Sequence, residues 1–420
     1  MKASTGKGAT CCDGGGRGKM IPEEILRSLV MQTDSRLVMA VIDGLGGLPV
    51  RGRTELGAAK IPNLDRLASR SVCGLIDPIS YGITPGSGPS HLALFGYDPF
   101  QYEIGRGVME ALGIGLHLAK DDLTARGNFA AMNEQGIIVD RRAGRIPTEK
   151  NREICQFLQK EIGEVDGVRI SIHPGKEHRF VLVFRGEGLR DQLTDADPQK
   201  EGLRNKGTEA LSPEAKRTAE IVNSTIRKAS EVLKSSHPAN TILLRGFSKV
   251  PDIPTMAERF NLRPAAIASY PMYRGLARLV GMETLETGET HKEIVETLKN
   301  HFESHDFFYL HFKKTDSAGE DGDFKKKVKV LEEVDRVIPS ILRLKPEVLV
   351  VTGDHSTPAA LKGHSWHPNP ILLYSQYVRP DGIRRFTEKA CGKGELGRFP
   401  AVHILPLMLA NGLKLKKFGA

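Results

Sequence analysis

The sequence contains no uninterrupted apolar run of roughly 18 residues, the length that a membrane-spanning helix requires. It has only five cysteines, an odd number, and their spacing fits neither a disulfide framework nor a zinc-binding CxxC pattern. The segment 1–20 is rich in glycine, lysine and serine and has no apolar core of the kind that a secretory signal carries. We therefore expect residues 1–20 to form a disordered tail, and the protein to work in the reducing cytoplasm without a membrane partner.

Local basic patterning is also scarce, although the formal net charge is +9. A nucleic-acid binder usually shows basic runs with aromatic residues between them. The one dense run consists of Lys325, Lys326, Lys327 and Lys329, at the start of an expected helix, and has no aromatic interleaving. We interpret this run as a solvated helix face and expect no nucleic-acid partner. The dispersed positive charge suits a small, polyanionic substrate.

Four short apolar runs predict strands of a parallel sheet that is buried on both faces. They lie at 37–42, 307–312, 348–352 and 371–374. Apolar residues at helical spacing occur between them, at 294–302 and at 330–341, where Pro339 is expected to kink the helix. Strand–helix–strand units of this kind build a doubly wound, mostly parallel α/β sheet.

The middle of the chain follows a different pattern. Short strands are expected at 136–140 and 178–184, and one long amphipathic helix over 213–234. We interpret residues 104–250 as an α+β domain that is inserted into a sheet domain formed by residues 21–103 and 251–420. A chain of 420 residues is long enough for two such domains.

Metal-binding side chains recur where the expected strands of the sheet end. The acids are Asp43, Asp316, Asp354 and, four residues after Asp316, Glu320; the histidines are His355 and His364. Ligands of an open parallel sheet bind beyond the carboxyl ends of its strands, so these side chains should converge. Taken singly, an aspartate before glycine is often only a turn residue. The set as a whole suits Mn²⁺, Zn²⁺, Mg²⁺ or Co²⁺, and two such ions can assist an in-line phosphoryl transfer.

Ser87 is the expected nucleophile of that transfer. It lies between two glycines, which let the backbone approach a phosphate closely, and it precedes an apolar helical stretch at 92–95. Coordination to a metal ion would lower the pKa of its hydroxyl. The alternatives are that Ser87 only caps the helix, or that Ser90 is the nucleophile. His91 is expected to be structural.

Five segments of the chain resemble the cofactor-independent phosphoglycerate mutases, above all their archaeal-type branch, within the alkaline phosphatase superfamily. They are VIDGLGG (41–47), TPGSGPSHLALFGYDP (84–99), KKTDSAGEDGD (313–323), VTGDHSTP (351–358) and GHSWHPNP (363–370). The resemblance implies an alkaline phosphatase-like fold. It also implies interconversion of 3-phosphoglycerate and 2-phosphoglycerate in glycolysis and gluconeogenesis, through a phosphoserine intermediate. Two divalent ions, usually manganese, would be needed, and 2,3-bisphosphoglycerate would not.

The same resemblance implies a role for each matching residue. One metal ion would be held by Asp43, Ser87, Asp354 and His355, and the other by Asp316, the residue at 320 and His364. The family usually has a histidine at position 320, where this chain has Glu320. A carboxylate can still bind a metal ion, or it can point to solvent while a water fills the coordination position.

The substrate's phosphate and carboxylate are best held by arginine. The candidates are the compact group Arg141, Arg142 and Arg145, together with Arg245 and Arg274, while Lys313 would neutralise developing charge. Two other functions fit part of this pattern: a phosphomonoesterase or phosphopentomutase of the same superfamily, and a catalytically inactive metal-binding protein. The arginine-rich inserted domain argues against the first, and Ser87 argues against the second. The sequence leaves the oligomeric state open.

Overall fold

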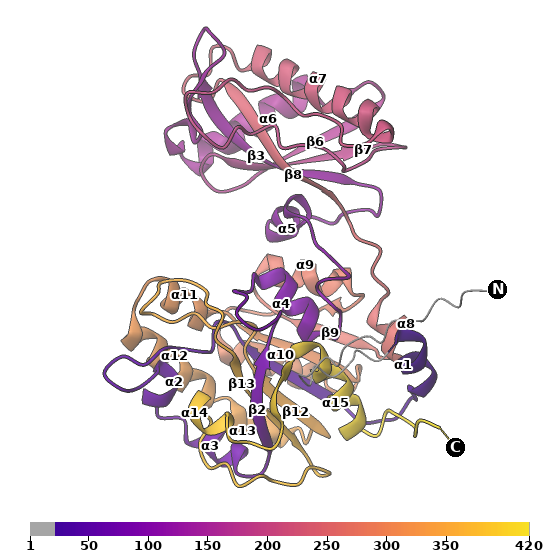
Figure 1. The fold of residues 1–420 in the computed structure, drawn as a ribbon, viewed down its shortest axis with the longest axis vertical. Coiled ribbons are helices and arrows are strands. Elements are labelled where there is room, and N and C mark those ends of the chain that lie inside the picture. The colour runs from indigo at the N-terminus through magenta and orange to yellow at the C-terminus, as the bar shows by residue number, and fades with distance from the viewer. Residues whose placement is uncertain (1–21, 420) are drawn as a thin grey trace, which may run out of the picture.

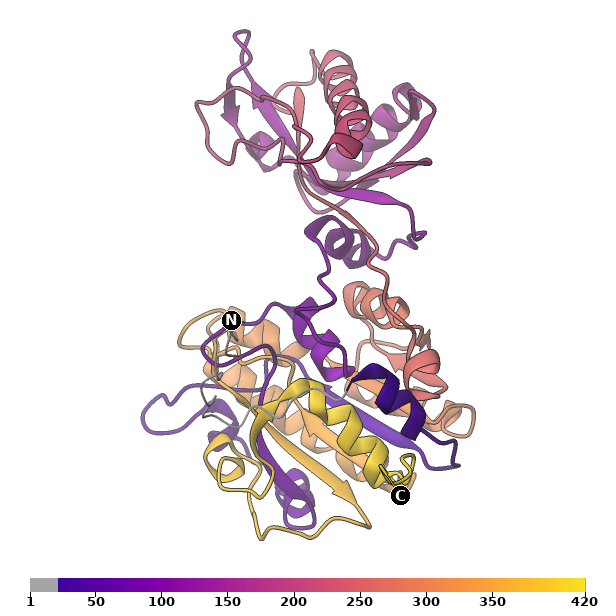
Figure 2. The same cartoon turned by 45° about the vertical axis from the view of Figure 1, so that its right-hand side comes forward.

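A computed structural model describes residues 22–419 of the chain. Two sheets, each with its own helices, organise this part of the chain (Figures 1 and 2). The expected disordered tail at 1–20 lies outside the described residues. No helix that the structure describes is both long and apolar enough to cross a bilayer.

The first sheet has eight strands. They are β1 (Leu37–Ile42), β2 (Val72–Asp77), β9 (Pro264–Ile267), β10 (Glu283–Thr284), β11 (Phe307–Phe312), β12 (Val348–Thr352), β13 (Asn369–Ser375) and β14 (Gly397–Pro400). Their order is β10–β9–β11–β1–β12–β13–β2–β14, and all neighbours run parallel except β13, which is antiparallel to both β12 and β2. The expected mostly parallel α/β sheet is confirmed, and all four apolar runs are strands of it.

Helices cover both faces of this sheet. Met39 of β1 packs into one helical layer and its neighbour Ala40 into the other, because successive strand residues point to opposite faces. One layer contains α1 (Glu23–Leu29), α4 (Ser87–Leu94), α8 (Met256–Phe260), α9 (Pro271–Leu279) and α15 (Ile404–Asn411). The other contains α2 (Glu55–Ala58), α3 (Pro62–Ala68), α10 (His291–His301), α12 (Phe324–Asp335), α13 (Ile338–Arg343) and α14 (Glu388–Cys391).

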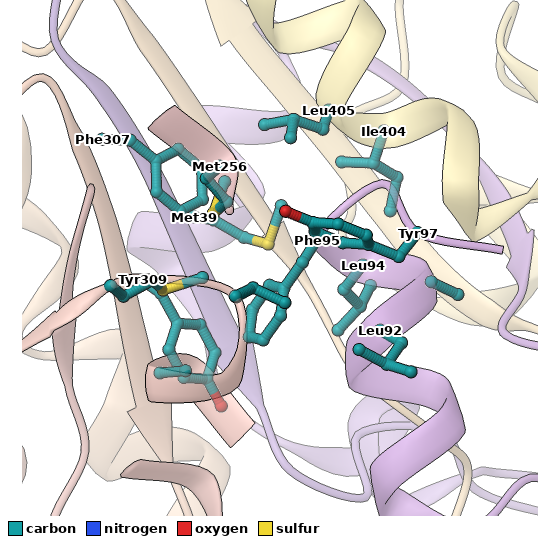
Figure 3. Packing of buried hydrophobic residues seen from close by; sticks show 14 of the residues in the cluster. Met39, Leu92, Leu94, Phe95, Tyr97, Met256, Phe307, Tyr309, Ile404 and Leu405 are labelled. Carbon is teal, nitrogen blue, oxygen red and sulfur yellow. The ribbon is translucent and has the colours of Figure 1, made fainter. Parts of the chain in front are cut away.

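Helix α4 is anchored to the sheet by the apolar residues at its C-terminal end. Leu92 and Phe95 are fully buried in the same cluster as Met39 of β1 and Tyr309 of β11 (Figure 3). The rings of Phe95 and Tyr309 meet edge to face with their centroids 4.9 Å apart. This packing fixes the start of α4, where Ser87 lies, at the carboxyl edge of the sheet.

Two expectations for residues 324–343 were wrong. The segment forms two helices rather than one kinked helix, because Pro339 lies in the first turn of α13, where a proline removes no intrahelical hydrogen bond. The basic run is also not a uniform solvated face. Lys325, Lys326 and Lys329 are exposed, whereas Lys327 is fully buried.

The second sheet is antiparallel and has six strands. They are β3 (Leu123–Met132), β4 (Ile138–Asp140), β5 (Glu164–Val165), β6 (Val168–Pro174), β7 (Arg179–Arg185) and β8 (Thr241–Lys249). Strand β3 pairs with β4, β7 and β8, and β6 links β7 to β5. Helices α6 (Thr148–Glu161) and α7 (Lys216–Val232) cover one face of this sheet, and α5 (Arg106–Gly113) lies against the other face, between the two sheets (Figure 1).

Candidate active site

Two groups of metal-binding side chains lie at the carboxyl edge of the first sheet. One consists of Asp43, Asp354 and His355, and the other of Asp316, His355 and His364; within each group the ligand atoms lie within 4.8 Å of one another. Asp43 follows β1, Asp354 and His355 follow β12, and Asp316 lies in α11 (Lys314–Glu320), directly after β11. These three strands are parallel neighbours, so their carboxyl ends bring the side chains together.

In the first group, three buried ligand atoms lie close to one another. Asp43 Oδ1, Asp354 Oδ2 and His355 Nε2 make no hydrogen bond to any residue that the structure describes. His355 Nε2 lies 3.4 Å from Asp43 Oδ1 and 3.1 Å from Asp354 Oδ2. Buried polar atoms are normally satisfied, so this donor set fits a divalent cation held between the three side chains.

The other atoms of these side chains are fixed by protein groups. Asp354 Oδ1 accepts a hydrogen bond from the Gly44 N–H at 3.1 Å, and His355 Nδ1 lies 3.0 Å from Thr357 Oγ1. Metal ligands usually have such outer partners, which set the orientation of a carboxylate and the tautomer of an imidazole. The arrangement is therefore organised as a metal site rather than as an accidental cluster of acids.

Neighbouring histidines and a lysine hold Asp43 in its ionised form. Burial would raise the pKa of Asp43, but His311, His355 and Lys313 hold it well below its usual value. Burial would likewise lower the pKa of His355, yet the neighbouring aspartates raise it to about 9. Asp43 Oδ2 accepts a hydrogen bond from the Tyr273 hydroxyl at 2.7 Å and lies 3.1 Å from Lys313 Nζ. The site is thus anionic at its centre and attracts positive charge.

The second group connects the metal-binding side chains to the loop before Ser87. His364 Nε2 lies 3.7 Å from Asp316 Oδ1, which also accepts a hydrogen bond from Thr357 Oγ1 at 2.7 Å. The His364 ring stacks on His355 at 3.6 Å between centroids. Its Nδ1 lies 3.0 Å from the main-chain oxygen of Pro85.

Glu320 is not brought into this group. It is the last residue of α11, it is exposed, and it belongs to neither group of metal-binding side chains. Asp316, one helical turn earlier, is buried. The structure favours the alternative in which Glu320 faces solvent.

Ser87 lies beside the first group. Its main-chain oxygen is 2.8 Å from His91 Nδ1, which lies 3.5 Å from Asp354 Oδ2. The Tyr273 hydroxyl, which donates a hydrogen bond to Asp43, also lies close to the Ser87 side chain. Burial raises the pKa of Tyr273, and the contact with Ser87 opposes this increase. Burial lowers the pKa of His91 to about 4, so the ring is neutral and suits the expected structural role.

Ser90, the alternative nucleophile, is less suited to attack. It is fully buried, and its hydroxyl is within hydrogen-bond distance of the main-chain oxygens of Gly86, at 2.9 Å, and Ser87, at 3.0 Å. A serine that donates to the preceding helical turn is occupied with the backbone. The geometry therefore favours Ser87.

The expected substrate-binding arginines fall into three settings. Arg141 forms a two-pronged ion pair with the buried Asp197, at 3.0 and 2.6 Å, and Arg245 Nε lies 3.9 Å from the same carboxylate. Arg142 and Arg145 are exposed. Arg274 lies in α9, beside the first sheet, and pairs with Glu286.

Comparison with known proteins places this geometry in a family. A family model described as 2,3-bisphosphoglycerate-independent phosphoglycerate mutase matches residues 68–240. A protein from Thermotoga neapolitana is 54% identical over 398 residues, covering 95% of this chain and 99% of its own length. One from Aquifex aeolicus is 52% identical and covers 94% of this chain and 100% of its own length. Both are named as probable 2,3-bisphosphoglycerate-independent phosphoglycerate mutases.

The chain belongs to the 2,3-bisphosphoglycerate-independent phosphoglycerate mutase family. The resemblance stated from the sequence motifs is confirmed, and the protein is an isomerase. A solved cofactor-independent phosphoglycerate mutase from Thermoplasma acidophilum has a similar fold, with a TM-score of 0.73 and 31% identity. That structure is matched over its whole length and over 90% of this chain.

Several residues beside Asp43 or on the second sheet were not predicted as functional from the sequence. Tyr273 and His311 stack at 3.8 Å between centroids, and both adjoin Asp43. Arg126 of β3 lies directly opposite Arg245 of β8. Burial and the neighbouring arginines lower the pKa of Arg126. One signal was available for each strand residue: His311 interrupts an aromatic and apolar strand, and Arg126 is the one charged residue of its strand.

Proposed function

We propose that the protein interconverts 3-phosphoglycerate and 2-phosphoglycerate by passing the phosphoryl group through Ser87, without 2,3-bisphosphoglycerate. The observation that carries this proposal is the position of Ser87 beside three buried ligand atoms that have no hydrogen-bond partner within residues 22–419. The printed names of the relatives support the choice of reaction. The cysteine pattern further leads us to propose a cytoplasmic location.

The site would take two divalent metal ions, with Mn²⁺ as the first choice and Mg²⁺, Co²⁺ or Zn²⁺ as alternatives. Asp43, Asp354 and His355, with the Ser87 hydroxyl, would hold one ion, and Asp316 and His364 would contribute to the other. Bound there, the ions would lower the pKa of the Ser87 hydroxyl and offset the charge of the transferred group.

Protein groups around Ser87 would assist the same step. Ser87 is the first residue of α4, so the unpaired backbone N–H groups of that helix favour a phosphate on its side chain. Lys313 Nζ lies 5.9 and 5.7 Å from the ring centroids of Tyr270 and Tyr273, at the edge of the acidic group. A lysine on a flexible stem can move from the aspartates to the phosphoryl oxygens.

Arginines of the second sheet would hold the substrate's anionic groups. Arg126 lies on the face that contacts α5, because its NH1 atom is 3.8 Å from Glu110 of that helix. Its neighbour Ala125 packs on the opposite face, under α6 and α7. Helix α5 lies between the second sheet and the first (Figure 1), so Arg126 and Arg245, which share the α5 face, lie on the side of the second sheet that is turned toward the first. We propose that the two sheets approach one another when substrate binds, with Arg141, Arg142 and Arg145 as further contacts.

The two opposing arginines have only loose carboxylate partners, because Arg126 lies 3.8 Å from Glu110 and Arg245 lies 3.9 Å from Asp197, and this supports the proposal of an anion site. Like charges directly opposite on neighbouring strands destabilise a sheet. A bound carboxylate or phosphate converts that repulsion into two charge-assisted contacts. Retention of the glycerate while it turns separates a mutase from a phosphatase, and such retention requires contacts of this kind.

The test is an enolase-coupled assay on 3-phosphoglycerate, run with Mn²⁺, with a chelator and with added 2,3-bisphosphoglycerate. We expect activity with Mn²⁺, its loss with chelator, and no response to 2,3-bisphosphoglycerate. Inorganic phosphate is measured in parallel. Release of free phosphate without isomerised product would instead support a phosphomonoesterase, and full activity in excess chelator would contradict the metal-dependent mechanism.

A further inference from the structure

Lys327 stands out as a charged residue on the buried stripe of α12. It shares the helical spacing of Val330, Leu331 and Val334, which are buried on the same helix, and it is itself 0% exposed. Lys329, two residues later on the same helix, is exposed. Burial of an ammonium group is unfavourable unless it is paired and hydrogen-bonded, so a role for Lys327 must be sought in its partners.

The Lys327 ammonium donates two hydrogen bonds within the described part of the chain, and both go to loops that carry metal-binding residues. Nζ donates to the main-chain oxygen of Gly46 at 2.9 Å and to that of Thr357 at 2.8 Å. Gly46 lies three residues after Asp43, and Thr357 lies two residues after His355. One side chain therefore joins the loop after β1 to the loop after β12.

Two carboxylates, the fully buried Glu55 and the partly buried Glu388, complete this arrangement from the other side. Glu388 accepts the Gly47 N–H at 3.0 Å, and Glu55 accepts the Ala359 N–H at 2.8 Å. Burial lowers the pKa of Lys327 to about 8, and the negative charges of Glu55 and Glu388 limit this decrease. Lys327, Glu55 and Glu388, here called the polar clamp, come from three separate helices and bind backbone groups of the same two loops.

The packing around the polar clamp leaves little space for the loops to shift. A Cβ atom added at Gly46 would lie 1.9 Å from Ser356 Oγ, and one added at Gly47 would lie 1.9 Å from Glu55 Oε2. The Thr357 N–H also donates to Gly46 O at 3.1 Å, so the two loops touch directly. Displacement of either loop would separate Asp43 from Asp354 and His355.

We propose that Lys327 is a positioning residue of the mutase site, which holds the Asp43 loop against the Asp354–His355 loop and thereby sets the geometry of the metal ligands. This inference rests on the proposed metal-dependent function. A lysine needed only to fill the core could be replaced by an apolar side chain of similar volume without effect on metal binding. A positioning lysine could not, because its two carbonyl contacts would be lost.

The experiment compares Lys327→Met with Lys329→Met, which removes the same charge from the exposed face of the same helix. For each full-length variant, Mn²⁺ affinity is measured by titration calorimetry after metal removal, together with kcat, KM and the thermal midpoint. Loss of an outer partner of metal ligands typically lowers metal affinity or activity by about 10- to 100-fold. We expect a loss of that size in Mn²⁺ affinity and kcat for Lys327→Met, with little change in KM, and no loss for Lys329→Met.

A second variant separates positioning from simple charge compensation. Lys327→Met leaves the fully buried Glu55 without its counter-charge, so the double variant Lys327→Met/Glu55→Gln removes the lysine together with the more deeply buried of its two carboxylates. We expect the double variant to regain thermal stability but not Mn²⁺ affinity. Recovery of both, or unchanged Mn²⁺ affinity in Lys327→Met, would overturn the inference. Absence of Mn²⁺ binding in the unaltered protein would instead contradict the proposed function.

Discussion

Replacement of Arg126 by methionine should impair catalysis without weakening the fold. Two small contributions to stability oppose each other at this position. Removal of Arg126 relieves its repulsion with Arg245, directly opposite on β8, which is worth roughly 0.2–1 kcal/mol. It also removes a loose ion pair with Glu110, at 3.8 Å, which contributes at most about 1 kcal/mol. The free energy of unfolding should therefore change by less than about 1 kcal/mol.

The effect on catalysis should be much larger. A hydrogen bond to a charged group contributes about 1.5–3 kcal/mol. If Arg126 makes such a contact to the substrate in the transition state, its loss lowers kcat/KM by about 10- to 150-fold, at 1.36 kcal/mol for each factor of ten. The enolase-coupled assay measures this ratio, and chemical denaturation measures the stability.

Arg185→Met is the matched control for Arg126→Met. Arg185 lies on the neighbouring strand β7 and forms a two-pronged pair with the buried Asp122, at 2.7 and 2.6 Å. Its removal leaves the buried Asp122 carboxylate without its ion-pair partner, so this variant should lose stability and keep kcat/KM. The two variants thus have opposite expected patterns. An unchanged kcat/KM in Arg126→Met would refute the assignment of the paired arginines to the substrate.

Three further predictions concern the metal and the substrate. Glu320→Ala should keep Mn²⁺ affinity in titration calorimetry while Asp316→Asn loses it, because only Asp316 lies in a metal-binding group; a comparable loss in both variants would make Glu320 a ligand. Mn²⁺ binding near neutral pH should release a proton, because the pKa of His355 is raised to about 9 and an imidazole must be neutral to bind a metal ion, so apparent affinity should rise with pH up to that value. Equal binding heats in buffers of different ionisation enthalpy would contradict this release. Arg141→Ala and Arg145→Ala should lower mutase activity more than hydrolysis of a small aryl phosphate, and equal losses would exclude a role on the substrate.

The position of the site follows from sequence because it depends on local rules. Apolar runs identify the strands of a parallel sheet, and the residues that follow each run must lie at one edge of that sheet. This rule alone predicts that Asp43, Asp354 and His355 converge. Ser87 was recognised by its two flanking glycines.

The pairing of distant strands and the burial of single charged residues could not be predicted from the sequence in the same way. The opposition of Arg126 and Arg245 depends on the register between β3 and β8, which are separated by more than a hundred residues. Lys327 was interpreted as solvated because charged residues are seldom buried. The helical spacing of Lys327 with Val330 and Val334 indicates that it faces the core. The basic composition of residues 325–329 favoured a solvated face instead. Whether Glu320 binds metal depends on the direction of its side chain at the end of a short helix, and a sequence motif does not specify that direction.

The most direct test of the account is to trap the phosphorylated enzyme. The protein is mixed with 3-phosphoglycerate and Mn²⁺, quenched in acid during turnover, digested and mapped by mass spectrometry. The account predicts one added phosphoryl group on the peptide that contains Ser87, and on Ser87 itself, with none in an inactive but folded Ser87→Ala variant. Continued turnover in Ser87→Ala, or a phosphoryl group found on Ser90 instead, would contradict it.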